Sequence, residues 1–382
     1  MKRSSDRILT THTGSLPRPD DLAAMGEGRD QRELSADPNY AASVRAAVQD
    51  VVTKQADAGV DVVNDGEVSK VGYSTYITDR VSGFEGENRE PRQRVEESMF
   101  PEFYRLQPTP GALVKRAVCT GPIEWRGAAQ VQQDIANLKA ALGGVSVTDA
   151  FMTAASPGVV WNFLDNQYYP NDEAYLHAVA DAVGNEYRAI VDAGFVLQVD
   201  CPDLAMGWNH QSFTGKTLDD FRSVAQMHVE ALNHALAGIP ADRVRLHLCW
   251  GNYEGPHVRD VPLARIWDIA IKANADAFSF EGANPRHEHE WGLFKETRLP
   301  DGRILIPGVL DSTTNFVEHP ELIAQRIERY AGLVGRENVI AGSDCGFSTF
   351  ARSKPTVHPT VTWAKFAAMA EGARIASERL WG

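Results

Sequence analysis

The sequence feature that most constrains the fold is a repeated alternation between short apolar segments and longer amphipathic segments. The apolar runs predict strands at residues 8–15, 60–67, 195–200, 245–251, 277–281, 304–311 and 339–346. The amphipathic stretches predict helices at residues 38–58, 172–193, 217–237 and 260–274, from Pro320 onward, and at 358–380. Strands that alternate with helices form βαβ units with parallel strands. The pattern therefore predicts the α/β class with a parallel sheet.

Side chains suited to chemistry close most of the strands, namely Ser15, Glu67, Asp200, His247, Cys249, Glu281, Asp311 and Cys345. An α/β barrel gathers its active site at the C-terminal ends of its strands. An open doubly wound sheet would look similar, but no Gly-x-Gly-x-x-Gly follows the first strand, and the sequence contains no Walker loop. We therefore expect a (β/α)8 TIM barrel.

Two points of the organisation stay open in the sequence. Nine strand candidates compete for eight barrel positions, so either 117–122 or 150–155 lies at the periphery. The segment 72–115, after the second strand, breaks the rhythm with charged residues between aromatic clusters. A lid, an interface arm and a solvated loop each fit this segment. We expect residues 1–382 to form a single barrel domain that carries it as an insertion.

The strand that contains His247 and Cys249 points to a metal site. Strand side chains alternate between two faces, so these two share the face opposite to Leu246. An imidazole beside a thiolate suits zinc, although the same pair also occurs as ordinary packing in core strands. Glu281 and Cys345 each end another strand of the predicted barrel. Four potential ligands thus converge on one face, and we expect Zn²⁺ there.

These residues resemble the C-terminal barrel of cobalamin-independent methionine synthase and the wider group of zinc-dependent thiol alkyltransferases, which includes epoxyalkane:coenzyme M transferase. The similarity runs from about residue 8 to the C-terminus. The family's His-x-Cys, its strand-end glutamate and its Asp-Cys-Gly fall on His247, Cys249, Glu281 and Cys345. Each motif alone is weak, but their order and spacing together are specific. The resemblance implies a TIM barrel that binds zinc and transfers an alkyl group to a thiol.

The resemblance also implies residues that bind the substrate. The family's Gly-Ser matches the loop at Ser15, which would hold the carboxylate of homocysteine. Its Gly-Glu and its Gln-aliphatic-Asp match Glu67 and Asp200, which would hold the ammonium group. A tryptophan near the family's active site looks like Trp161. Considered from the residues alone, Glu67 and Asp200 could instead cap the helices that follow them.

Two motifs depart from the pattern of the methionine synthases. The family's Asp-Glu-Pro is Asp200-Cys201-Pro202 here, and its Asp-Ile-His-Ser is Asp311-Ser312-Thr313-Thr314. The second change removes the histidine that the resemblance implies as proton donor to the leaving group. The N-terminal barrel of full-length methionine synthases, which helps to hold the folate, also has no counterpart in these 382 residues. The zinc and thiol chemistry therefore carries over better than the methyl donor.

Other residues are weaker candidates. We assign His12 and Asp311 as catalytic candidates, with strand packing and stabilisation of the barrel as their respective alternatives. His287 and His289 could replace the missing proton donor, while a solvated loop or the start of a helix is the plainer interpretation of both. We expect Cys119 and Cys201 to be core residues.

The predicted function is zinc-dependent methyl transfer from 5-methyltetrahydrofolate, or a related carrier, to homocysteine or a similar thiol, as in methionine biosynthesis. The first alternative is alkyl transfer to another thiol, such as epoxide opening by coenzyme M. A sulfonate would be repelled by Glu67 and Asp200 unless Arg18, Lys70 or Arg126 reached the site. The second alternative is a metal-free barrel lyase of the decarboxylase type, which would not need the histidine and the two cysteines together.

Composition narrows the class of partner. A net charge of −13 argues against nucleic acid and anionic membranes as partners, and it favours small molecules. Four cysteines are too few for a disulfide framework, and residues 1–7 lack the apolar core of a signal peptide. We therefore expect a cytoplasmic enzyme, and the sequence leaves open whether it forms a homo-oligomer.

Overall fold

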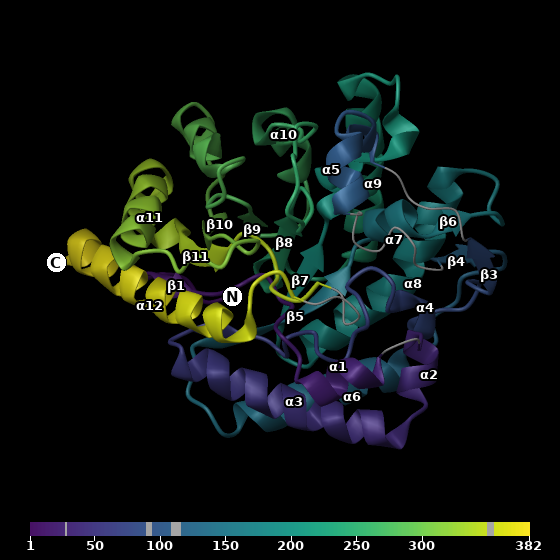
Figure 1. Cartoon of the computed structure of the whole chain (residues 1–382), viewed down its shortest axis with the longest axis horizontal. Coiled ribbons are helices and arrows are strands. Elements are labelled where there is room, and N and C mark those ends of the chain that lie inside the picture. Colours follow the sequence, from purple (N-terminus) through teal and green to yellow (C-terminus); the bar gives the residue numbers. More distant parts are fainter. Residues whose placement is uncertain (27–28, 89–93, 108–115, 350–354) are drawn as a thin grey trace.

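The structure is a computed structural model of the whole chain, and it describes residues 1–26, 29–88, 94–107, 116–349 and 355–382 (Figure 1). Eight parallel strands form its centre in the order β1-β11-β10-β9-β8-β7-β5-β2. Their bounds are β1 Leu9–Thr10, β2 Val62–Val63, β5 Asp149–Ala155, β7 Val196–Asp200, β8 Val244–Leu248, β9 Ala277–Phe280, β10 Ile304–Leu310 and β11 Ile340–Ser343. The amide of Asp61 donates to the carbonyl of Thr10 at 3.1 Å, which joins the two ends of the sheet. The expected (β/α)8 barrel is confirmed.

Helices cover the outside of the barrel. The main ones are α3 Pro38–Asp57, α6 Ala128–Leu142, α8 Asp172–Asp192, α9 Leu218–Ala235, α11 Pro320–Val334 and α12 Pro359–Trp381. Shorter helices are α1 Asp20–Met25, α2 Gln31–Ser35, α4 Ile77–Arg80, α5 Pro101–Leu106, α7 Pro157–Phe163 and α10 Trp267–Ala270. In Figure 1, α3 and α6 lie together on one side of the strands, and α11 and α12 lie together on another.

The helix predicted at 260–274 is wrong in its length. The chain forms a short 3₁₀ turn at Leu263–Arg265 and then α10, which has four residues. Ile266 between them has φ −130°, which is not helical, so one continuous helix does not form. Conversely, α6 was not expected from the sequence, although Gly127 and Gly143 bound it.

Strand pairing decides which of the two competing candidates lies outside the barrel. Strand β4 (Arg116–Cys119) lies outside the barrel, in a small sheet with β3 (Gly86–Asn88) and β6 (Asp165–Asn166). Strand β5 instead pairs with β2 and β7 over its length. The peripheral candidate is therefore 117–122.

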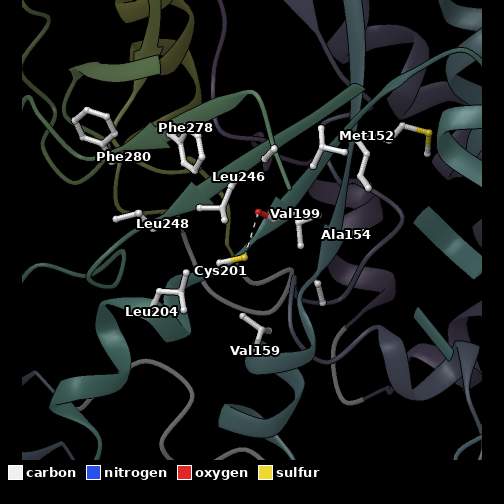
Figure 2. Close-up of a cluster of buried hydrophobic side chains, with 14 of the residues drawn as sticks. Met152, Ala154, Val159, Val199, Cys201, Leu204, Leu246, Leu248, Phe278 and Phe280 are labelled. Atoms are coloured by element: carbon white, nitrogen blue, oxygen red, sulfur yellow. Dashed lines mark hydrogen bonds between the residues drawn. The ribbon is translucent and has the colours of Figure 1, made fainter. Parts of the chain in front are cut away.

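The two faces of the barrel strands have different surroundings. Leu246 and Leu248 of β8 pack in the apolar layer between strands and helices with Phe278 and Phe280 of β9 (Figure 2). Cys201 lies in the same layer and is 1% exposed. Cys119 is also fully buried, so the expectation of two core cysteines is confirmed.

A polar network fills the interior of the barrel. Arg245 of β8 is 1% exposed, and its Nε donates to Gln198 Oε1 at 2.7 Å. Gln198 Nε2 donates in turn to Asp200 Oδ1 at 2.7 Å. The Nη2 of Arg245 donates to the carbonyl of His12 at 2.5 Å. The network therefore links β7 and β8 to the segment that follows β1.

The insertion predicted at 72–115 falls partly on residues outside the described ones, 89–93 and 108–115. Its described parts include α4, β3, a 3₁₀ turn η1 (Val95–Ser98) and α5. Within the described part of the chain, no helix is both long and apolar enough to cross a bilayer.

Candidate active site and metal centre

A cavity of about 710 Å³, counted to its open mouth, lies at the C-terminal ends of the barrel strands. Six residues that were predicted for the site line it: Ser15, Glu67, Asp200, His247, Cys249 and Cys345. They come from β1, β2, β7, β8 and β11 or from the residues directly after these strands. The parallel barrel therefore gathers residues that are up to 330 positions apart in the chain, as 345 minus 15 shows.

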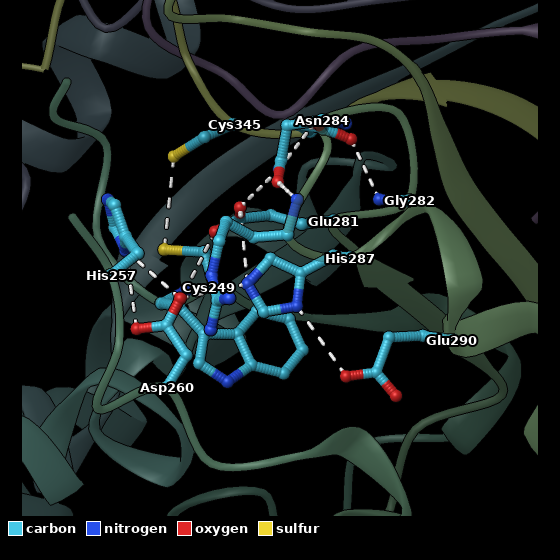
Figure 3. Close-up of polar contacts among 12 residues, drawn as sticks. Cys249, His257, Asp260, Glu281, Gly282, Asn284, His287, Glu290 and Cys345 are labelled. Carbon is cyan, nitrogen blue, oxygen red and sulfur yellow. Dashed lines mark hydrogen bonds and ion pairs between the residues drawn. The ribbon is translucent and has the colours of Figure 1, made fainter. Parts of the chain in front are cut away.

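Three side chains form a compact donor group. One ligand atom each of His247, Cys249 and Cys345 lies within 4.8 Å of the other two. The two thiol sulfurs are 3.9 Å apart (Figure 3). Zinc binds Cys sulfur at about 2.3 Å and His nitrogen at about 2.0 Å, so two sulfur ligands at a tetrahedral centre lie roughly 3.8 Å apart. The separation of the two sulfurs fits a shared metal ion.

His247 is oriented as a metal ligand would be. Its Nδ1 lies 3.2 Å from Ser279 Oγ, while its Nε2 is buried and has no hydrogen-bond partner. Burial, together with the charge of Arg245, lowers the pKa of His247 to about 3. The ring is therefore neutral at physiological pH and keeps a lone pair, which is the form that binds a metal. The orphaned nitrogen shows that these residues fit an ion.

Glu281, the fourth predicted ligand, lies beside this group but is not part of it. Its Oε1 accepts from the amide of Trp250 at 2.7 Å, and its Oε2 accepts from Asn284 Nδ2 at 2.7 Å. Cys249, burial and then Glu281 raise the pKa of the Cys345 thiol well above its usual value. Figure 3 shows the carboxylate next to the two thiols. Carboxylate oxygens accept more than one bond, so Glu281 retains capacity for a further partner.

Asp344, which the sequence analysis did not select, ties two of the ligand loops together. Its Oδ1 accepts from the amides of Gly282 and Ala283, each at 2.8 Å. Its Oδ2 accepts from the amide of Asn284 at 2.9 Å and from Asn284 Nδ2 at 2.8 Å. The residue before Cys345 thereby fixes the loop that follows Glu281. Its place in the Asp-Cys-Gly motif was the signal that could have identified it.

A buried cluster lies behind Glu281. His287 is 2% exposed and directly precedes a 3₁₀ helix at Glu288–Lys295, so the expected helix start is confirmed; the solvated surroundings hold for His289, which is exposed, and not for His287. His287 Nε2 lies 3.0 Å from Asp260 Oδ2 and 4.0 Å from Glu281 Oε2. The ring of Trp250 stacks on it with centroids 3.9 Å apart. Burial lowers the pKa of His287, but the contacts with Asp260 and other carboxylates outweigh it and raise the pKa to about 10.

The second part of the cavity is acidic. Asp200 accepts from Gln198, and burial together with the charge of Glu67 raises the pKa of Asp200 well above its usual value. Among the described residues, none donates a hydrogen bond to the Glu67 carboxylate, which lines the cavity. Neither acid caps a helix: the short 3₁₀ turn after Asp200 spans Pro202–Leu204 with Cys201 as its N-cap, and α4, the next helix after Glu67, has Tyr76 as its N-cap. The capping alternative is therefore wrong, and two acids face the same space.

Glycines shape this acidic part. Gly14 has φ +151°, and a Cβ at that position would clash with the Glu67 carboxylate. A Cβ added at Gly346, next to Cys345, would likewise clash with the hydroxyl of Ser15. The loops after β1, β2 and β11 can therefore approach one another closely, because glycine, which has no side chain, occupies the two contact points.

Three predicted residues lie elsewhere in the structure. Trp161 packs against the ring of His228, with centroids 4.9 Å apart, and is not part of the cavity lining. His12 is 1% exposed between Phe151 and Phe366, which favours strand packing.

Asp311, the third, accepts from the amide and the hydroxyl of Thr313, each at 2.8 Å, and from the hydroxyl of Thr314 at 2.6 Å. These bonds shape the turn after β10, and they favour the alternative in which Asp311 stabilises the barrel. Catalytic roles for His12 and Asp311 stay predictions.

Comparison with known proteins agrees with this geometry. The family described as "cobalamin-independent synthase, catalytic domain" matches residues 8–100 and 115–369. A methionine synthase from Saccharolobus islandicus is 24% identical over 381 residues, which cover 98% of this chain and 96% of that protein.

Two solved structures share the fold. One is a B12-independent methionine synthase from Shewanella in complex with selenomethionine, with a TM-score of 0.71 and 17% identity, covering 98% of this chain and 99% of the other. The second is a putative vitamin-B12-independent methionine synthase from Listeria monocytogenes, with a TM-score of 0.66, 19% identity and the same coverage.

Proposed function

The chain belongs to the family of cobalamin-independent synthase catalytic domains, and on this premise we propose that it methylates the thiol of homocysteine or a closely similar amino-thiol. The proposed donor is 5-methyltetrahydrofolate or a related carrier, and the proposed metal is zinc. The enzyme is thus a transferase that acts on small molecules. The observation that carries the proposal is the meeting of His247, Cys249 and Cys345 in one cavity with Glu67 and Asp200.

The donor set suits zinc and the activation of a thiol. Two thiols and an imidazole bind zinc in preference to magnesium or calcium, which favour oxygen ligands. Zinc at this group would deprotonate the thiol of the substrate at neutral pH, and the thiolate is the nucleophilic form. Ser279 holds the ring of His247 with its orphaned nitrogen free, and Asn284 with the amide of Trp250 holds the proposed fourth ligand, Glu281.

The acidic part of the cavity would orient the substrate. An ammonium group between Glu67 and Asp200 would restore charge balance to two acids, since burial and then the charge of Glu67 raise the pKa of Asp200. The loop at Ser15 borders the same space and is free to take the carboxylate of an amino acid. Tyr73, Phe163 and Met206 add apolar lining that limits access of water. Held in this way, the thiol is positioned for in-line attack on the methyl carbon.

The experiment is a calorimetric titration of the zinc-loaded protein with homocysteine, repeated in buffers of different ionisation enthalpy to count released protons. We expect saturable binding with release of about one proton, because the thiol binds as thiolate. Cys345→Ser should lose most of its zinc and this proton release while the thermal transition is retained. Cys119→Ala, a buried thiol outside the cavity, is the matched control.

The possible outcomes separate the proposed function from its two alternatives. Binding of mercaptoethanesulfonate but not of homocysteine would replace the proposal with alkyl transfer to an anionic thiol. This second candidate is favoured by one observation, the cation Arg94 in the cavity lining. A protein that takes up no zinc, or a Cys345→Ser variant with full zinc content, would overturn the metal centre and return the metal-free lyase to consideration.

A further inference from the structure

Arg94 is a cationic side chain in the wall of an otherwise acidic cavity. It borders the space that Glu67, Asp200, Cys249 and Cys345 also line. Within the described part of the chain, no other lysine or arginine contributes to this lining. A single positive charge in a site with two acids and two thiols marks a place where negative charge of a ligand is favourable.

The guanidinium of Arg94 lies over an aromatic ring. Its Cζ lies 3.4 Å from the centroid of Tyr253. The hydroxyls of Tyr253 and Tyr104 both donate to Glu96 Oε1, and Glu96 is fully buried. The amide of Glu96 donates to Asn209 Oδ1 at 3.2 Å. These contacts anchor the residues around Arg94 to the barrel, so the cation has a defined place.

The contact with Tyr253 covers one face of the guanidinium and leaves its N–H edge for hydrogen bonds. The Nη1 atom of Arg94 is buried and has no hydrogen-bond partner among the residues that the structure describes. Among the described residues, no carboxylate lies within ion-pair distance of this side chain. A buried donor of a charged group without an acceptor is costly, and no described residue supplies that acceptor, so a ligand in the cavity is a suitable partner for it.

The three cations considered from the sequence do not serve this purpose. Arg18 donates to the carbonyls of Ser348, Glu67 and Lys70 at 2.7–2.9 Å. Lys70 Nζ donates to the carbonyl and hydroxyl of Thr153 at 2.6 and 2.9 Å. The Arg126 side chain is 63% exposed and lies 3.7 Å from Glu124. The first two already have acceptors within the protein, and the third lies at the surface.

We infer that Arg94 binds an anionic group, a carboxylate or a sulfonate, of a substrate whose reacting end lies at the thiol pair. Arginine presents two parallel N–H donors that match the two oxygens of such a group. This inference rests on the proposed function for the place of the reaction, and it adds which chemical group of the substrate the enzyme selects. The anion can belong to the thiol or to the alkyl donor, and the experiment separates these sources.

The test measures binding to zinc-loaded protein by calorimetry, with two pairs of ligands in which one member is anionic and the other is uncharged. The thiol pair is mercaptoethanesulfonate and mercaptoethanol. The donor pair is 5-methyltetrahydrofolate, whose glutamate carries the carboxylates, and a 5-methyltetrahydropterin that lacks the p-aminobenzoylglutamate. Arg94→Gln should weaken the anionic member of at least one pair by roughly tenfold to a hundredfold, as expected for a lost charge-assisted bond. The uncharged member should change by less than about twofold, and Arg94→Lys should retain part of the binding.

Arg126→Gln removes a surface arginine and is the matched control. An effect on the thiol pair alone assigns the anion to the acceptor, and an effect on the donor pair alone assigns it to the alkyl donor. Equal loss for both members of each pair, or no loss in either pair, would overturn the inference. Wild-type protein that binds neither zinc nor mercaptoethanol would instead overturn the proposed function, so the two failures are distinguishable.

Discussion

Glu67 has a backbone conformation that is rare for its residue type. Its φ is 54°, in the left-handed region, and it follows Gly66 with φ 67°. A non-glycine residue there is strained, and such strain persists where the surrounding structure imposes it. Here the turn aims the carboxylate at the cavity, against the backbone of Gly14. The strain supports a functional assignment for Glu67 that no sequence motif alone could establish.

Glu67→Gln should selectively weaken binding of an amino-thiol. The substitution keeps the shape and removes the charge that faces the ammonium group, so the dissociation constant for homocysteine should rise by roughly tenfold to a hundredfold. Binding of mercaptoethanol, which has no ammonium group, should stay within about twofold. Calorimetry on both ligands measures this, with Glu85→Gln, an exposed acid, as control. Equal effects on both ligands would show that Glu67 does not contact an ammonium group.

Residue positions on strands could be predicted better than side-chain partners. His247, Cys249 and Cys345 lie together because alternation along strands fixes which side chains face the barrel axis. Arg94 could not be found, since its role depends on Tyr253, which is 159 positions away (253 minus 94). Trp161 and His12 belong to packed surroundings that only the folded chain reveals.

At the scale of elements, the site depends on loops that different strands supply. The loop after β9 carries Glu281, and the residues after β11 carry Cys345. Four hydrogen bonds to Asp344 join these loops. Partners that orient metal ligands are commonly worth 10-fold to 100-fold in metal affinity, by order of magnitude.

Asp344→Asn should therefore weaken zinc binding. An amide offers one acceptor oxygen in place of two, so at least one of the four donors loses its partner. We expect about a tenfold to hundredfold lower zinc affinity in a competition assay with a chromophoric chelator, with the barrel still folded by circular dichroism. Asp301→Asn, at an exposed side chain, should leave the affinity unchanged. An unchanged affinity in Asp344→Asn would mean that the loops hold their positions without this carboxylate.

Long helices with caps were predictable, and short connecting elements were not. Helix α3 begins with Asp37 as its cap and Pro38 in its first turn, and α11 begins at Pro320, as the sequence indicated. The segment 260–274 has helical periodicity, but its last residues lie outside α10, where Asn233 bonds to the amide of Asn274 and the carbonyl of Lys272. The periodicity of apolar residues along the sequence gives no information on such long-range contacts.

At the scale of the molecule, buried ionisable groups make stability depend on pH. His12 is enclosed in the core, and burial lowers its pKa to about 3 from an ordinary 6.5. As the pH falls from about 7 to about 5, the unfolded chain takes up a proton at this residue and the folded chain does not. His12 therefore contributes a loss of about 2 kcal/mol of stability over this interval.

His12→Gln should reduce this loss. Glutamine does not titrate, so the decrease in unfolding free energy between about pH 7 and about pH 5 should be smaller by about 2 kcal/mol than in the wild type. Chemical denaturation at several pH values measures the difference. His289→Gln alters an exposed histidine and should follow the wild type. If His12→Gln follows the wild type as well, the ring is accessible to protons in the folded state.

The pairing of β1 with β11 sets an order on biosynthesis. Leu9 and Thr10 of β1 pair with Ile340 and Ala341 of β11. The barrel therefore cannot close until β11, the last of its strands in the chain, has been synthesised. Cys249 is translated long before Cys345, and the nascent chain holds an incomplete donor group until then. An ion that needs both thiols is therefore acquired only after Cys345 has been synthesised. If that ion is the proposed zinc, a cell short of zinc would hold chains in which the donor group has assembled and no ion is bound.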